Sequence, residues 1–208
     1  MTTIQFAPER FNSPDAIYQD VLVKDGDKSV ARWYDALSSS YDQLYDREQS
    51  LKHSLVLGLF GKSRFDMLID IGCGTAVFLQ RAQQNYVYAL GVDVSRKMLE
   101  RARNRRLRNV DLVQAASSFL PIKGETVDCT VSISTSKADE NFPRMMADVG
   151  RVSRGRSTLA ITFFQEPGSR PIGLDESGSI TSISQRESLY FADRDLSQSR
   201  RNANMLIG

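Results

Sequence analysis

Two carboxylates and two glycines carry the clearest chemical signal in this chain. In Phe65–Gln80 (FDMLIDIGCGTAVFLQ), one apolar run ends at Asp70 and another begins after Gly72-Cys73-Gly74. Glycine tolerates positive φ and has no Cβ, so a strand can end here, turn tightly and lead into a helix. We expect that helix to present unpaired N–H groups to a ligand. Asp93 ends the next apolar run, where a carboxylate can accept both hydroxyls of a ribose. The spaced set predicts a ligand that contains a nucleoside.

The glycine spacing argues against one class of nucleoside ligand. Turns that bind dinucleotides read Gly-x-Gly-x-x-Gly, and their third glycine lets the helix and strand pack closely. Val77 occupies the third position here. We therefore expect a nucleoside ligand other than a dinucleotide.

Alternating strand and helix patterns around this turn predict an α/β fold. The predicted strands cover residues 66–71, 86–93, 110–115, 126–134 and 158–164, and the predicted helices cover residues 76–84, 96–105 and 144–152. Strands joined through helices form a mostly parallel sheet, so we expect a three-layer, doubly wound domain with its ligand at the carboxyl ends of the strands. After Gln165, the segments SITSIS, SLYFADR and NANMLIG predict an antiparallel edge strand at the C-terminus.

The region before the glycine turn is helical, with Ser38-Ser39-Ser40 dividing it into two helices and Gly61 closing the second. We assign residues 1–28 to a partly mobile N-terminal extension and residues 29–208 to one domain. Four leucines recur at the spacing of an amphipathic helix: Leu44, Leu51, Leu55 and Leu59.

Three tyrosines in the same region are each followed by aspartate, namely Tyr34, Tyr41 and Tyr45. They would share one face of a continuous helix. Such residues pack in an amphipathic helix, and their rings also suit a cationic or aromatic ligand near the turn.

Composition narrows the class of protein. The chain has 208 residues, of which 41% are hydrophobic, and it has no apolar run of about 18 residues that could span a membrane. Cys73 and Cys129 form no metal or disulfide framework, and the N-terminus lacks the apolar core of a signal peptide. We expect a cytoplasmic, metal-free protein, in which His53, the only histidine, is a surface or packing residue.

Positive charge gathers in one predicted helix. Arg96–Arg108 contains seven basic residues and one acid, Glu100, although the net charge of the whole chain is only +2. This cluster could attract a phosphate backbone, or it could be an ordinary solvated helix face.

The motifs LIDIGCGTA and GVDVSRKMLERAR resemble those of the class I S-adenosylmethionine-dependent methyltransferases. The resemblance extends over residues 29–164, through YDALSSSYDQLYDREQ and LPIKGETVD. It implies a Rossmann-like methyltransferase fold, S-adenosyl-L-methionine as cofactor and methyl transfer as the activity.

The resemblance also implies which residues bind the cofactor. Asp70, Gly72, Cys73 and Gly74 would contact its amino-acid end, and Asp93 its ribose. Val94 and Met98 would flank the adenine, Ala116 and Ser117 would lie at the adenine edge, and Tyr41 and Tyr45 would close over the sulfonium. The chain departs from the family in having no acid at Ala116 and no Asn-Pro-Pro-aromatic sequence after the fourth strand. No general base is assigned.

Three hypotheses remain for the methyl acceptor. The basic helix, in a small domain without a recognisable substrate module, favours RNA or a substrate delivered by a partner subunit. The Tyr-Asp-bearing N-terminal helix and the compact core are similar in style to small transfer-RNA wobble-uridine methyltransferases, some of which need a small zinc-binding activator protein. The alternatives are a small molecule such as a quinone or metabolite, and a non-catalytic subunit that binds the cofactor.

Overall fold

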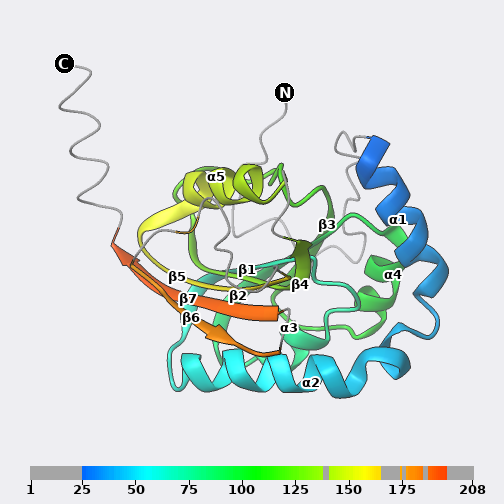
Figure 1. Ribbon diagram of the computed structural model, residues 1–208, viewed down its shortest axis with the longest axis horizontal. Helices are drawn as coiled ribbons and strands as arrows, with labels where there is room; N and C mark the ends of the chain where they lie inside the picture. Colours follow the sequence, from blue (N-terminus) through cyan, green and yellow to red (C-terminus); the bar gives the residue numbers. More distant parts are fainter. Residues whose placement is uncertain (1–24, 138–140, 165–173, 175–176, 185–186, 196–208) are drawn as a thin grey trace.

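One seven-stranded sheet organises the protein, and helices cover both of its faces (Figure 1). The computed structural model describes residues 25–137, 141–164, 174, 177–184 and 187–195. The helices are α1 (Asp25–Leu37), α2 (Tyr41–Phe60), α3 (Val77–Arg81), α4 (Arg96–Asn104) and α5 (Phe142–Val152). The strands are β1 (Phe65–Ile71), β2 (Tyr86–Asp93), β3 (Val110–Gln114), β4 (Val127–Lys137), β5 (Ser153–Phe164), β6 (Ser179–Ser182) and β7 (Glu187–Asp195).

The strand order is β3-β2-β1-β4-β5-β7-β6. The first five strands pair in parallel, whereas β7 pairs antiparallel with both β5 and β6. The order reverses between β1 and β4, which is where sheets of this kind bind ligands. The predicted mostly parallel sheet with an antiparallel C-terminal strand is confirmed. The edge strand is β6, and the NANMLIG segment lies outside the described residues.

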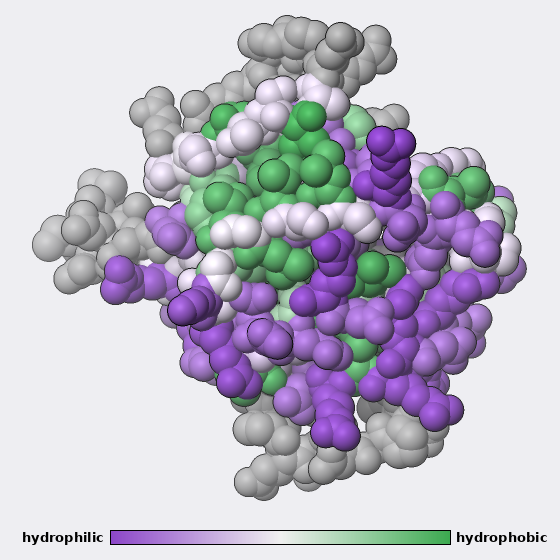
Figure 2. Space-filling view, turned by 90° about the horizontal axis from the view of Figure 1, so that it is seen from below, coloured by the Kyte–Doolittle hydropathy of each residue, from purple (hydrophilic) through white to green (hydrophobic). Residues whose placement is uncertain are grey.

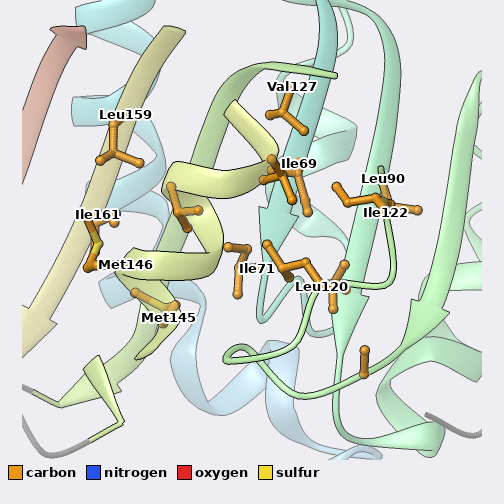
Figure 3. Packing of buried hydrophobic residues seen from close by; sticks show 14 of the residues in the cluster. Ile69, Ile71, Leu90, Leu120, Ile122, Val127, Met145, Met146, Leu159 and Ile161 are labelled. Carbon is orange, nitrogen blue, oxygen red and sulfur yellow. The ribbon is translucent and has the colours of Figure 1, made fainter. Parts of the chain in front are cut away.

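The alternation of β1 divides the core into two clusters. Ile69 and Ile71 point to the face covered by α5, where they pack with Met145 and Met146 (Figure 3). Leu68 points to the opposite face, into a cluster with side chains of α2, α3 and α4. Burial on both faces explains why β1 is an almost continuous apolar run.

The two predicted N-terminal helices are present, but α2 buries a different face from the one its leucines suggest. Its inward side chains are Lys52, His53, Val56 and Phe60. The four leucines at helical spacing are instead between 40% and 61% exposed. The surface seen from the side of α2 accordingly carries hydrophobic areas among hydrophilic ones (Figure 2). Hydrophobic spacing identified the helix but not its buried face, because the inward face includes Lys52, which pairs with Glu187, and His53, whose ring packs against Phe78.

The first described residue, Asp25, begins α1, so this helix crosses the predicted boundary between residues 28 and 29. That boundary, and the mobility of the extension before it, stay predictions. Gly61 ends α2 as expected, with φ 54° and its N–H bonded to Leu57 O.

Candidate functional site

The glycine turn after β1 is held by its own chain. The N–H groups of Gly72 and Cys73 both donate to Val92 O, at 2.7 and 3.0 Å. The N–H of Gly74 donates to Asp93 Oδ2 at 2.8 Å. These three N–H groups of the turn are therefore not free for a ligand, because the end of β2 lies close enough to accept them. Helix α3 is also shorter than predicted.

Gly72 is required by a close contact. Its φ is +74°, and a Cβ added there would lie 2.0 Å from Thr135 Oγ1. Thr135 in turn donates its hydroxyl to Ile71 O at 3.0 Å, at the end of β1. The carboxyl ends of β1 and β4 are thus locked together at the point where the strand order reverses.

Asp93 connects the turn to the next loop. Its Oδ2 accepts from Gly74 N, and its Oδ1 accepts from Ser95 N at 2.8 Å. Burial raises the pKa of Asp93 to about 6, against the lowering effect of those two hydrogen bonds. Each oxygen has a second lone pair, so the carboxylate can hold the turn and still accept from a ligand.

A cavity opens at the carboxyl ends of β1, β2 and β4. Eight of the predicted cofactor residues line it: Tyr41, Gly72, Gly74, Asp93, Val94, Met98, Ala116 and Ser117. Ser95 caps the helix that carries Met98 by accepting from Met98 N at 3.2 Å. We call this space the first cavity.

A second cavity lies between α2 and the glycine turn. It is lined by the remaining predicted residues, Tyr45, Asp70 and Cys73, and it shares Tyr41, Gly72 and Gly74 with the first. Burial, followed by the charge of Asp93, raises the pKa of Asp70 to about 8. Burial also raises the pKa of the Cys73 thiol well above its usual value. At neutral pH the thiol is therefore protonated and apolar in character.

The three tyrosines remain together despite the break between the helices. The ring centroids of Tyr34 and Tyr41 are 6.0 Å apart, and those of Tyr41 and Tyr45 are 4.8 Å apart. Burial is the main reason that the pKa of Tyr34 and that of Tyr41 are raised. The result is a wall of neutral rings at the junction of the two cavities.

Polar contacts attach the N-terminal helices to the basic helix α4. Asp35 Oδ1 accepts from Ser95 Oγ at 2.5 Å and from Lys97 N at 3.1 Å. Arg105 pairs with Asp42 at 2.5 Å and also donates to Thr75 O. Arg101 donates to Ser39 O at 3.1 Å.

These contacts bear on the predicted phosphate-binding patch at Arg96–Arg108. Arg101 and Arg105 bind other parts of the fold, and Arg96 forms an ion pair with Glu100 at 3.3 Å. The guanidinium groups of this helix are therefore partly engaged within the protein, which an isolated helical pattern could not show.

A buried cluster of charged side chains holds Ser134, which lines the first cavity. Lys52 Nζ lies 2.8 Å from Glu187 Oε2 and 2.5 Å from Glu48 Oε1, and it donates to Ser134 Oγ at 2.6 Å. Lys52 and Glu187 are 1% and 4% exposed. Ser134 lines the first cavity with φ +58°, a conformation that is uncommon for a residue with a side chain. The cluster fixes the wall that Ser134 forms.

Several lining residues were not predicted. Ile133, Ser134 and Thr135 come from the end of β4, and Phe142 and Met145 come from α5. The hydroxyl run Ser134–Ser136 at the end of a buried strand, beside the position where the strand order reverses, is the signal that could have identified the first group.

Asp139 and Glu140, which the sequence places after the fourth strand, lie outside the described residues. Within the described ranges, no group of three or more His, Cys, Asp or Glu side chains could hold a metal ion. No helix in this part of the chain is both long and apolar enough to cross a membrane.

Parts of the sequence are similar to those of known proteins. Residues 68–156 match the family model described as a methyltransferase domain. The chain is 30% identical over 135 residues to an uncharacterised protein of Methanocaldococcus jannaschii, covering 64% of this chain and 51% of the relative. It is 26% identical over 143 residues to malonyl-[acyl-carrier protein] O-methyltransferase of Hamiltonella defensa, with 66% and 55% covered. It is 23% identical over 111 residues to demethylmenaquinone methyltransferase of Tropheryma whipplei, with 52% and 46% covered. The chain thus spans about half the length of these relatives.

Solved structures show the same fold. A SAM-dependent methyltransferase from Aquifex aeolicus aligns with a TM-score of 0.58 and 18% identity, over 74% of this chain and 97% of that one. DhpI in complex with SAM aligns with a TM-score of 0.59 and 16% identity, over 89% and 91%. A Haloferax volcanii methyltransferase in complex with the Trm112 activator aligns with a TM-score of 0.58 and 16% identity, over 62% and 59%.

The strand order, the Asp93-anchored glycine turn and the matched family model agree with the resemblance seen in the sequence motifs. Residues 68–156 match the methyltransferase-domain family model, and the chain has the fold of solved S-adenosylmethionine-dependent methyltransferases.

Proposed function

We propose that this protein transfers a methyl group from S-adenosylmethionine to a small-molecule acceptor. The observation that carries the proposal is the placement of Asp93. Its carboxylate lines the first cavity and also anchors the turn at which the first cavity meets the second. A nucleoside in the first cavity would therefore place the group attached to its ribose at the junction, beside Tyr41.

The described residues fit this cofactor. Asp93 can accept from the ribose hydroxyls, and Met98 and Val94 supply apolar surface for the adenine. Asp70 Oδ2 is buried and has no hydrogen-bond partner in the described part of the chain. A buried acceptor of this kind is costly unless a ligand satisfies it, which supports Asp70 as a contact of the cofactor's amino-acid end.

Methyl transfer mainly requires that the acceptor atom and the methyl group be aligned. The cofactor supplies a methyl group on a sulfonium, and an acceptor atom displaces the sulfur, which keeps the electron pair of the broken bond. The protein contributes by holding acceptor and methyl at attack distance. The rings of Tyr41 and Tyr45 stand where a positive charge can lie against aromatic faces. Since Asp93 also brings a carboxylate to the junction, the site suits a cation.

A small-molecule acceptor agrees better with the observations than RNA does. The relatives whose names give a substrate act on malonyl-[acyl-carrier protein] and demethylmenaquinone. RNA was expected to bind the basic cluster Arg96–Arg108, but Arg101 and Arg105 of that cluster bind within the protein. Transfer to RNA and a non-catalytic role are therefore outcomes that an experiment must separate from the proposed one.

A protein activator also remains a prediction. One structural neighbour was solved with the Trm112 activator, but at 16% identity the likeness supports the fold alone. Mixing the two purified proteins and measuring their molar mass by light scattering would test it, and a mass equal to that of the separate chains would contradict it.

The cofactor assignment is tested by calorimetry with S-adenosylmethionine. Replacing Asp93 with Asn should weaken binding by about 1–3 kcal/mol, the range for losing a hydrogen-bond acceptor that carries charge. Asp111→Asn is the matched control, because Asp111 lies within β3, bonds to Tyr88 and lines neither cavity. Equal affinity for the Asp93 variant and wild type would contradict the ribose assignment.

The acceptor class is tested with a tritiated methyl donor. Quinone and lipid extracts, acyl-carrier proteins and total RNA are offered separately, and label should enter one of the first two. Label only in RNA would overturn the small-molecule proposal. No label in any fraction, with normal cofactor binding, would indicate a non-catalytic subunit.

A further inference from the structure

Two buried acceptor atoms share the second cavity. Asp70 Oδ2 and His53 Nδ1 are both buried and make no hydrogen bond to the described residues. Their residues are 2% and 5% exposed, and both line the second cavity. Buried polar atoms are nearly always paired in native proteins. Two unpaired atoms in one cavity, contributed by β1 and α2, point to a ligand with more than one donor.

His53 is held in the uncharged form. Its ring packs edge-on against Phe78, with centroids 5.4 Å apart. Burial, followed by the charges of Arg81 and Lys52, lowers the pKa of His53 to about 4. At neutral pH the ring carries one proton, and with that proton on Nε2 the Nδ1 atom accepts a hydrogen bond.

The other groups around the cavity favour a positively charged donor. The lining includes Asp42, Asp46, Tyr45 and Gln49 and, among the described residues, no lysine or arginine. Asp42 is already bonded to Arg105 and Thr75, and among the buried lining side chains it is His53 and Asp70 that have unsatisfied acceptor atoms. The nearby turn cannot serve a carboxylate through Gly72 and Cys73, because their N–H groups bond to Val92 O.

We infer that His53 Nδ1 and Asp70 Oδ2 together bind the ammonium group at the amino-acid end of the cofactor. The inference rests on the proposed cofactor and adds His53 to the residues that bind it. An ammonium group has three N–H donors in a compact arrangement, so it can satisfy both orphaned acceptors at once. A lone histidine on α2 thereby becomes a residue that recognises the amino acid portion rather than the nucleoside.

Two ligands separate these portions. S-adenosylhomocysteine carries the amino acid, whereas 5′-methylthioadenosine has the same nucleoside and sulfur without it. His53→Phe keeps a ring against Phe78 but has no nitrogen, and His53→Asn keeps a polar atom close to the position of Nδ1. By calorimetry, the Phe variant should bind S-adenosylhomocysteine about 10- to 100-fold more weakly, the loss expected for one hydrogen bond to a charged group. Its affinity for methylthioadenosine should stay within about twofold, and the Asn variant should recover part of the loss.

A packing role gives the opposite order, since Phe would be tolerated and Asn would not. The inference is overturned if the Phe variant binds S-adenosylhomocysteine as wild type does, if it loses both ligands equally, or if Asn is the weaker variant. Thermal melting of each variant reports its folding. Failure of the wild type to bind either ligand would overturn the proposed cofactor and the inference together, whereas normal binding with an unaffected Phe variant overturns only the role of His53.

Discussion

Replacing Lys52 with Met should strongly destabilise the protein, because Lys52 is the cation of a buried cluster. Its Nζ forms ion pairs with Glu187 at 2.8 Å and Glu48 at 2.5 Å, and it donates to Ser134 Oγ at 2.6 Å. Methionine fills a similar volume with an unbranched chain, so the substitution mainly removes the charge. The two carboxylates then differ in their access to water, because the side chain of Glu187 is 4% exposed and that of Glu48 is 52% exposed.

The magnitude follows from that difference. Glu48 can return to water, whereas Glu187 becomes a buried charge without its partner, which typically costs about 3–5 kcal/mol. Removing the other partner should cost less. In Glu187→Gln, Lys52 still has Glu48, and the loss should be about 1.5–3 kcal/mol, the value of a hydrogen bond to a charged group. Since a domain is stable by only about 5–15 kcal/mol, Lys52→Met could remove most of the margin.

The assay is urea unfolding followed by circular dichroism, on wild type, both single variants and the double variant Lys52→Met with Glu187→Leu. A buried ion pair can often be replaced by apolar side chains at little cost, so the double variant should be more stable than Lys52→Met alone. The reasoning is refuted if Lys52→Met loses less than about 1 kcal/mol, or if the double variant is no more stable than it.

Three further predictions follow from the site. In the absence of ligand, stability should fall as pH rises toward 8. Burial raises the pKa of Asp70 to about 8, so the folded protein holds a proton that the unfolded chain releases above its own pKa of about 4. Asp70→Asn should flatten this slope in melting temperatures measured between pH 5 and 9, and an unchanged slope would contradict the burial of Asp70. Gly72→Ala should weaken cofactor binding and lower the melting temperature, since its Cβ would lie 2.0 Å from Thr135 Oγ1 at a φ of +74°. Adding Thr135→Ser, which keeps that oxygen, should not restore the melting temperature, and a double variant as stable as wild type would contradict the contact. Asp35→Ala should cost about 1 kcal/mol in urea unfolding, as other lost helix caps do, because Asp35 bonds to Ser95 and to the first turn of α4; no change would show that Ser95 alone caps the helix.

Sequence reasoning succeeded where chemistry depends on local spacing. The apolar runs located β1 and β2 to within a residue, and Asp93 at the end of β2 does face the glycine turn. The resemblance to the methyltransferase family implied Val94 and Met98 as cofactor residues, and both line the first cavity. All eleven predicted cofactor residues line one of the two cavities, although their contacts with the cofactor stay predictions.

The features that sequence reasoning missed depend on contacts between distant residues. No local pattern shows that Lys52 pairs with Glu187, and without that partner a buried lysine would be implausible. The spacing of the leucines therefore could not show which face of α2 is buried. The accepting role of Val92 O toward the glycine turn is likewise a property of neighbouring strands. His53 was expected to be a packing or surface residue, and only its burial in the same cavity as Asp70 suggests a ligand for its Nδ1 atom.

The attachment of α1 and α2 to later parts of the chain has a consequence for the order of folding. The partners of these helices come later in the sequence: Asp35 bonds to Ser95, Asp42 pairs with Arg105, and Lys52 bonds to Ser134 and Glu187. Synthesis therefore delivers the two helices long before their partners. Until then, Val56 and Phe60 of α2 lack the sheet they cover, and the outward leucines add to the apolar surface. Contacts this distant in sequence form slowly, so we expect the N-terminal helices to dock late, after the central strands have paired.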